Sequence, residues 1–99
     1  MIGVSTSEEL KDVLKNENEY EFIYLMADIT LSSGIKINEK KEKIIIDGTY
    51  NNIRYTLTGV TSTEAADMIM ASSLNKEIVV RNININFLNT YRYLCAIRY

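Results

Sequence analysis

The hydrophobic pattern near the start of the chain has the period of an α-helix. Three apolar residues recur at spacings of three and four positions and so share one helix face: Leu10, Val13 and Leu14. Two overlapping capping boxes, one beginning at Ser5 and the other at Thr6, fit the start of such a helix. The sequence therefore predicts a helix over about residues 5–16. A helix of this length must pack its apolar stripe against the rest of the chain to be stable.

From about residue 20 onward, short apolar runs separated by turn residues replace the helical period. The alternation of apolar and polar residues in these runs predicts short β-strands. The segment 62–72 fits either a helix or a short strand, and the neighbouring strands favour a strand at Met68–Met70. The charged segment Glu39–Lys43 is typical of a solvated turn, and Asp47-Gly48 is a turn signal.

The predicted strands form three groups that repeat along the chain at irregular intervals. The first group is Ile35–Ile37, Met68–Met70 and Leu94–Ala96; the second is Phe22–Met26, Ile44–Asp47 and Ile78–Arg81; the third is Ile29–Leu31, Tyr55–Thr58 and Ile83–Phe87. Three short strands per turn are typical of a parallel β-solenoid, whose stacked coils bury a continuous apolar column. A small α+β domain with a mixed sheet is an alternative for the same strands.

Composition agrees with a small strand-rich domain and excludes several kinds of site. The 99 residues include 14 Ile and 10 Asn, which favour packed strands and tight turns respectively. A net charge of −2 predicts no nucleic-acid partner, and the short apolar runs predict no membrane span. With no His and one Cys, His-dependent catalysis, Cys/His zinc sites and internal disulfides are excluded. The first residues lack the features of a signal peptide.

The order of the motifs resembles the N-terminal part of right-handed parallel β-helix proteins of the pectate lyase-like superfamily. The segments that carry the resemblance are Ser7–Leu10, Ile23–Leu25, Asp28–Leu31, Ile44–Gly48, Leu57–Gly59 and Ile78–Ile85. The resemblance covers nearly the whole chain. It implies a mainly β fold, a right-handed parallel β-helix (solenoid) of about three coils over residues 20–99. In that family a helix covers the N-terminal end of the solenoid, and here residues 5–16 would do so.

The resemblance also implies where the protein acts and how its bends are built. Members of this kind are extracellular or lie at the cell surface, so the same location is expected here. Such solenoids run to many more coils, which predicts that the chain is a fragment or a truncated member. Asp47-Gly48 and Asn82 would fall at tight bends between strands, where a left-handed backbone is expected.

The resemblance raises the question of a pectate lyase site, which needs an Arg base and calcium held by Asp residues. Asp67 and Glu64 are too few for the six to eight oxygen ligands of calcium. The four candidate bases are Arg54, Arg81, Arg92 and Arg98, and exposed positions on the solenoid wall explain them better. We therefore expect no metal site and no cofactor in this chain.

A pair of carboxylates and a lone thiol are the remaining candidates for catalysis. Asp28 and Asp47 fall at comparable coil positions, where two carboxylates could approach each other as in glycoside hydrolases. Turn chemistry explains Asp47 better, because Gly48 follows it. Cys95 lies in an apolar run and is expected to be a buried hydrophobe. We therefore expect no catalytic residue in this chain.

A strip of Asn residues is the best candidate for binding. Asn82, Asn84 and Asn86 alternate with apolar residues and share one strand face. One interpretation is a structural one, an outward polar face or an Asn ladder. The other is a strip that contacts carbohydrate together with Tyr91 and Tyr93, since polar groups beside aromatic rings suit flat polysaccharides.

These observations predict a non-catalytic carbohydrate-binding, adhesive or structural module of a bacterial surface or extracellular β-helix protein. The alternative is the N-terminal portion of a polysaccharide lyase or glycoside hydrolase whose active site lies beyond this chain. The C-terminal coil has no following coil to cover it, which predicts self-association there. The residues expected to mediate it are Tyr93, Leu94, Ile97 and Tyr99.

Overall fold

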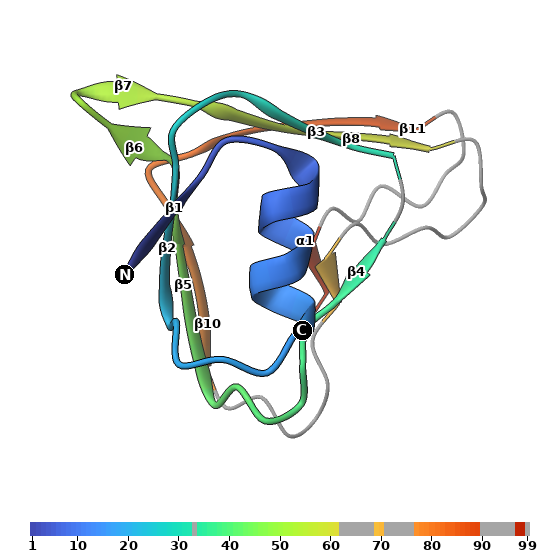
Figure 1. Cartoon of the computed structure of the whole chain (residues 1–99). Helices are drawn as coiled ribbons and strands as arrows, with labels where there is room; N and C mark the ends of the chain where they lie inside the picture. Colours follow the sequence, from blue (N-terminus) through green and yellow to red (C-terminus); the bar gives the residue numbers. More distant parts are fainter. Residues whose placement is uncertain (33, 62–68, 71–76, 90–96, 99) are drawn as a thin grey trace.

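The fold of the chain is mainly β, with one helix among the residues that the structure describes (Figure 1). The computed structural model describes residues 1–32, 34–61, 69–70, 77–89 and 97–98. The helix is α1 (Ser7–Lys15). The strands are β1 (Ile2–Val4), β2 (Phe22–Leu25), β3 (Ile29–Leu31), β4 (Ile35–Lys36), β5 (Lys43–Asp47), β6 (Thr49–Tyr50), β7 (Ile53–Arg54), β8 (Thr56–Thr61), β9 (Ile69–Met70), β10 (Glu77–Arg81), β11 (Asn84–Asn89) and β12 (Ile97–Arg98).

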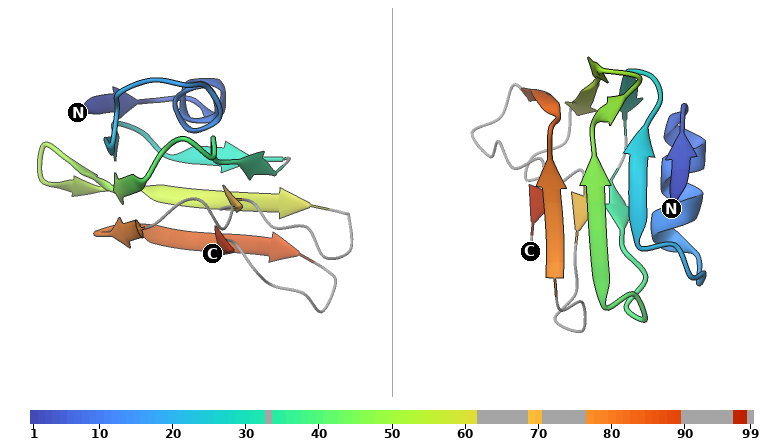
Figure 2. Two further views of the ribbon diagram at one scale, coloured as in Figure 1. Left: turned by 90° about the horizontal axis from the view of Figure 1, so that it is seen from below. Right: turned by 90° about the vertical axis from the view of Figure 1, so that its left-hand side faces the viewer.

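The strands form three parallel sheets and one antiparallel hairpin. The strand orders are β1-β2-β5-β10, β3-β8-β11 and β4-β9-β12, and β6 pairs with β7 in the hairpin. Every pairing within the three larger sheets is parallel. The chain therefore visits the three sheets in turn and returns to the first, so that β2–β3–β4, β5–β8–β9 and β10–β11–β12 form a first, second and third layer. Figure 2 shows these layers stacked, with α1 next to the first one.

Two of the three groups of strands expected from the sequence each form one sheet, and two members of the remaining group share a sheet. The group at 22–26, 44–47 and 78–81 corresponds to β2, β5 and β10, and the group at 29–31, 55–58 and 83–87 corresponds to β3, β8 and β11. A strand is confirmed at Ile69–Met70, while residues 62–68 lie outside the described part. In the first group, residues 35–36 and 69–70 form β4 and β9, and β12 (Ile97–Arg98) completes their sheet, whereas the expected member at 94–96 lies outside the described residues. Strand β1 and the hairpin were not predicted.

Helix α1 begins with the second of the two expected capping boxes. The Glu9 N–H donates to Thr6 Oγ1 at 3.1 Å, and Glu9 Oε1 accepts from the Ser5 N–H at 3.3 Å. The first bond satisfies an N–H that the first turn leaves without a helical partner, and the second holds the residue that precedes the N-cap Thr6. The predicted stripe of Leu10, Val13 and Leu14 is buried. The helix packs against β1, β3 and β4, which explains how nine residues remain helical.

Equivalent inward positions of successive layers stack in columns. Ile23 of β2 pairs with Ile46 of β5, which pairs with Val80 of β10. Another column runs through Ile29, Leu57 and Ile85. These β-branched and Leu side chains pack well against the same face of the neighbouring strand. The columns form the core on which α1 also packs.

One expectation for the charged segment 39–43 is wrong. Lys41 is only 5% exposed, and its ammonium donates to the backbone oxygens of Asn18 at 3.4 Å and Tyr20 at 2.8 Å and to Asn18 Oδ1. Burial lowers the pKa of Lys41, and the carboxylate of Glu21 opposes part of that shift. Lys41 therefore ties the loop after α1 to the segment before β5. Its neighbours at 39, 40, 42 and 43 are exposed, as expected.

The two bends expected to be left-handed differ from each other. Asn82 has a φ of 51°, which confirms the expectation there. Gly48 does not have a positive φ, so the expected reason for a glycine at this bend is wrong. The true reason is space: a Cβ on Gly48 would lie 2.5 Å from the Asn82 carbonyl oxygen and 2.6 Å from the Ile83 Cα. Only glycine lets the bends of the second and third layers approach this closely.

We expect the change Leu14→Ala to lower the free energy of unfolding by about 2–5 kcal/mol, because Leu14 is fully buried between α1 and the strands. The measurement is chemical or thermal denaturation. The matched control is Lys15→Ala, which replaces an exposed neighbour on the same helix and should change stability by less than about 0.5 kcal/mol. Equal stability of Leu14→Ala and the parent chain would contradict the packing of α1.

Candidate functional site

A hairpin inserted between β5 and β8 projects from the corner between two of the sheets (Figure 1). Its two central residues, Asn51 and Asn52, have φ values of 52° and 64°. Two consecutive positive φ angles indicate a type I′ turn, for which Asn is one of the preferred residues. The hairpin exposes Tyr50 and Ile53 at this corner. It is the largest departure of the described strands from the layered arrangement.

Asp47 anchors the hairpin to the third layer. Its Oδ1 accepts from the Thr49 N–H at 2.9 Å and from the Thr49 hydroxyl, and its Oδ2 accepts from Arg81 Nε at 2.9 Å and Asn82 Nδ2 at 3.3 Å. Burial alone would raise the pKa of Asp47, but the hydrogen bonds from Thr49, Arg81 and Asn82 outweigh it and lower the pKa to about 2. Asp47 is therefore a carboxylate held in place, with no proton to transfer near neutral pH.

Aromatic residues gather on the outer face of the β1-β2-β5-β10 sheet beside the hairpin. The rings of Tyr24 and Tyr50 are stacked, with centroids 5.6 Å apart and an interplanar angle of 19°. The Arg81 guanidinium lies 5.2 Å from the centroid of the Phe22 ring, which is a cation–π contact. Tyr24 and Phe22 are half-buried, and Tyr50 remains 39% exposed. We call Phe22, Tyr24, Tyr50 and Arg81 the aromatic corner.

Polar side chains line the outer face of the β3-β8-β11 sheet. The strand register places Thr30, Thr58 and Asn86 in one row and Thr56 and Asn84 in a second row. Neighbouring members of a row are about 4.8 Å apart, the spacing of adjacent strands. Thr30, Asn84 and Asn86 are exposed. We call these five residues the polar ladder. It presents uncharged hydroxyl and amide groups at regular intervals across all three layers.

The residues predicted to bind carbohydrate separate into three sets. Asn84 and Asn86 lie together on the polar ladder, as their alternation predicted. Asn82 does not join them, because it occupies the bend and donates to Asp47. Tyr91 and Tyr93 lie outside the described residues.

Sequence reasoning missed the three threonines of the polar ladder and the Tyr24–Tyr50 pair of the aromatic corner. The alternation in Tyr55–Thr58 was visible, and aligning it with β11 would have paired Thr56 with Asn84. The Tyr pair depends on the inserted hairpin. The sequence Asn51-Asn52 between two short β-prone pairs was the available signal for it.

The suggested pairing of Asp28 and Asp47 is wrong. The register sets Asp47 beside Tyr24 and Arg81, whereas Asp28 precedes β3 and its Oδ1 accepts from the Thr56 N–H at 2.8 Å. Both carboxylates therefore serve as structural acceptors at different positions of the layers. No cluster of three or more His, Cys, Asp and Glu able to hold a metal ion occurs among the described residues.

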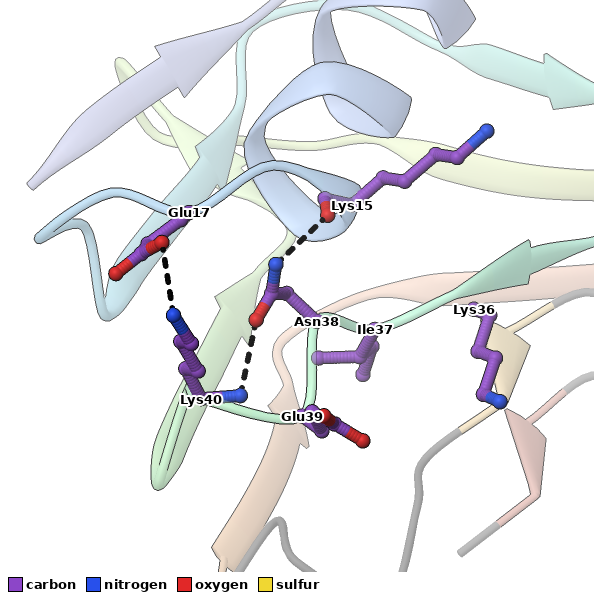
Figure 3. Close-up of a pocket in the computed structure, with 7 residues that line it drawn as sticks. All are labelled: Lys15, Glu17, Lys36, Ile37, Asn38, Glu39 and Lys40. Atoms are coloured by element: carbon purple, nitrogen blue, oxygen red, sulfur yellow. Dashed lines mark hydrogen bonds and ion pairs between the residues drawn. The ribbon is translucent and has the colours of Figure 1, made fainter.

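An open hollow of about 400 Å³ lies at the end of α1 (Figure 3). Asn38 bridges its sides, donating to the Lys15 carbonyl at 3.2 Å and accepting from the Lys40 N–H at 2.9 Å. Lys40 also forms an ion pair with Glu17 at 3.2 Å. The hollow is thus open and lined by charges of both signs, of which Lys40 and Glu17 pair with each other, so it offers no convergent set of groups for one ligand.

The described part of the chain contains no helix that is long and apolar enough to cross a membrane.

The low pKa of Asp47 leads to a prediction about acid stability. A carboxylate whose pKa is lower in the folded than in the unfolded protein stabilises the fold above its unfolded pKa, near 3.8, and loses this effect as the pH falls toward about 2. We expect Asp47→Asn to lower the free energy of unfolding at pH 7 by about 1–3 kcal/mol, the usual range for hydrogen bonds to a charged group.

The measurement is denaturation of both proteins between pH 7 and pH 2. The difference in the free energy of unfolding between the parent chain and Asp47→Asn should stay constant down to about pH 4 and shrink below it. Asp28→Asn is the matched control. This variant retains Asp47, so its free energy of unfolding should still fall steeply at acid pH. A stability difference between the two proteins that is as large at pH 2 as at pH 7 would contradict the assigned role of Asp47.

Comparison with known proteins identifies the family of this chain. No curated protein and no solved structure matches the chain at a significant level. One family model does match, over residues 1–97, and its description is a pectate lyase-like adhesive domain. That match takes in every layer of the described fold, the hairpin and α1. The chain therefore belongs to the family of pectate lyase-like adhesive domains.

Proposed function

We propose that this domain is a non-catalytic adhesive module that binds a neutral polysaccharide along the polar ladder. The observation that carries the proposal is the row of Thr30, Thr58 and Asn86, flanked by Thr56 and Asn84, on one outer face. Membership in an adhesive family supports binding as the general activity and an extracellular or cell-surface location. The identity of the ligand is our inference from the chemistry of the face.

We also propose that the layered sheets form a right-handed parallel β-helix of about three coils. Three observations support it: the parallel pairing, the recurrent order of the three sheets, and the stacked inward columns. In such a fold, successive coils repeat the same outward positions one strand spacing apart. A long flat ligand can then contact equivalent groups on several coils.

The chemistry of the polar ladder favours carbohydrate with no net charge. Hydroxyl and amide groups both donate and accept hydrogen bonds, as sugar hydroxyls do. The side chains of Thr30, Thr58, Asn84 and Asn86 have no hydrogen-bonding partner among the described residues, so a ligand would not have to break existing bonds. The ladder itself contains no Lys or Arg, which an acidic polysaccharide would require. The chain as a whole is also slightly acidic.

The experiment is a glycan array followed by titration of the neutral polysaccharide that binds best. We expect the double variant Asn84→Ala, Asn86→Ala to bind about tenfold or more weakly, because two hydrogen-bonding side chains are lost. Lys36→Ala is the control, since Lys36 is exposed on a different sheet and should leave the affinity unchanged. Binding only to acidic glycans, or unchanged affinity of the double variant, would overturn the assignment.

The expectation that this chain has no catalytic residue gives a prediction of its own. Arg81, the candidate base in the aromatic corner, is held by Asp47 and lies over the Phe22 ring. We expect the domain not to cleave polygalacturonate with or without calcium, as measured by ultraviolet absorbance of the unsaturated product. Reproducible product that disappears in Arg81→Ala would identify the domain as an enzyme and replace the proposal.

A further inference from the structure

The open edge of strand β10 has the sequence and the backbone polarity to pair with a second copy of itself. Among the described residues, β10 pairs only with β5, and no described strand lies along its other edge. Its inward residues Ile78 and Val80 are only half-buried, whereas their equivalents in the second layer, Ile44 and Ile46, are fully buried. An unpaired edge flanked by incompletely buried apolar residues is a site for strand addition.

The backbone direction shows which groups of β10 face the open edge. The Glu77 N–H donates to the Glu42 carbonyl at 2.9 Å, and the Arg81 carbonyl accepts from the Gly48 N–H at 3.1 Å. Residues 77 and 81 thus turn their polar groups toward the second layer. Because successive residues of a strand alternate, the N–H and C=O groups of Ile78 and Val80 face the open edge.

The charges of β10 fit a single antiparallel register. The strand reads Glu77-Ile78-Val79-Val80-Arg81, with opposite charges at its two ends. If two copies pair antiparallel about a two-fold axis at Val79, Glu77 of each copy lies opposite Arg81 of the other. In the same register Ile78 lies opposite Val80 of the second copy, and these are the residues whose N–H and C=O groups face the edge. They can therefore exchange two hydrogen bonds per pair.

The neighbouring strand extends this complementarity. Within one copy, Lys43 lies 3.8 Å from Glu77, and Asp47 lies 2.9 Å from Arg81. Across the junction, a row would run Lys43, Glu77, then Arg81 and Asp47 of the second copy, with the sign of the charge alternating at each step. Arg81 can serve both carboxylates because its guanidinium has five N–H donors. Shifting the centre of pairing from Val79 loses this alternation.

We propose that two copies of this domain associate edge to edge through β10, antiparallel and centred on Val79, so that their sheets join into one. The contact uses different residues from the self-association expected from the sequence, which named Tyr93, Leu94, Ile97 and Tyr99. Of those four, only Ile97 lies in the described part of the chain. The proposal does not depend on the ligand of the polar ladder, because β10 and the ladder belong to different sheets.

A cysteine scan tests the position of the axis. In a background with Cys95→Ser, Val79→Cys should form a disulfide-linked dimer on mild oxidation, because directly opposed residues of this kind have Cα atoms about 4.5 Å apart, within disulfide range. Ile45→Cys is the matched control. Ile45 is the partner of Val79 on β5, and two copies of it would be three strand spacings, about 14 Å, apart. Failure of Val79→Cys to link, or equal linking of both variants, would overturn the proposal.

Sedimentation of charge variants tests the register. The parent chain should show a dimer at micromolar concentration, and Glu77→Lys should raise the dissociation constant at least tenfold by placing like charges opposite each other. Lys36→Glu is the control, because Lys36 is an exposed charge on a different sheet and its reversal should leave the dimer intact. Mixing Glu77→Lys with Arg81→Glu should restore a mixed dimer, since opposite charges then meet at both ends.

Thermal denaturation of each variant checks that it is folded. A parent chain that stays monomeric at high micromolar concentration would overturn the proposal, as would equal effects of Glu77→Lys and Lys36→Glu on dimerisation. Glycan affinity should be the same in the parent and in Glu77→Lys, so a failure of dimerisation and a failure of ligand binding can be told apart.

Discussion

Stacking of equivalent side chains between parallel layers is the constraint on which the rest of this structure depends. A parallel register brings residue after residue of β2, β5 and β10 side by side, so an inward Ile meets an inward Ile or Val in each layer. A slip of one residue would turn every inward side chain outward, and the two buried layers could not tolerate it. The helix adds to this core from one side only, by packing Leu10 and Leu14 on the first layer.

The bend between β5 and β8 shows how the strand register is kept despite the inserted β6–β7 hairpin. Eight residues, from Gly48 to Tyr55, separate β5 from the start of β8, yet β8 still pairs in line with β3 and β11. Two features maintain this alignment. Gly48 lets the second and third layers approach closely, and Asp47 ties the base of the hairpin to Arg81 and Asn82. The aromatic corner can form only because the hairpin brings Tyr50 onto Tyr24.

The strand groups were predictable because a column of stacked positions leaves a repeated apolar pattern in the sequence, as Ile29, Leu57 and Ile85 do. The helix was predictable from its caps and stripe. Features that depend on contacts between distant segments were not. The sequence around Lys41 predicts a solvated side chain. Its burial depends on the backbone oxygens of Asn18 and Tyr20, which are distant in sequence and accept hydrogen bonds from its ammonium. Two of the five residues of the polar ladder, Asn84 and Asn86, were predictable from their alternation with apolar residues. The three threonines could be assigned to it only from the register of β8 with β3 and β11.

The same stacking rule links the fold to its outer surfaces. The inward columns form the apolar core, so most outward positions can carry binding groups, and the strand register aligns these groups from layer to layer. On the β3-β8-β11 sheet this produces rows of hydroxyl and amide groups, and on the β1-β2-β5-β10 sheet it produces rows of alternating charge. Stacking also requires a next layer. In the third layer the column residue Ile85 is 47% exposed, whereas Leu57 beneath it is 3% exposed. Within the described residues the stacking that builds the core is thus incomplete at Ile85, and burial of such side chains by a further strand would favour association there.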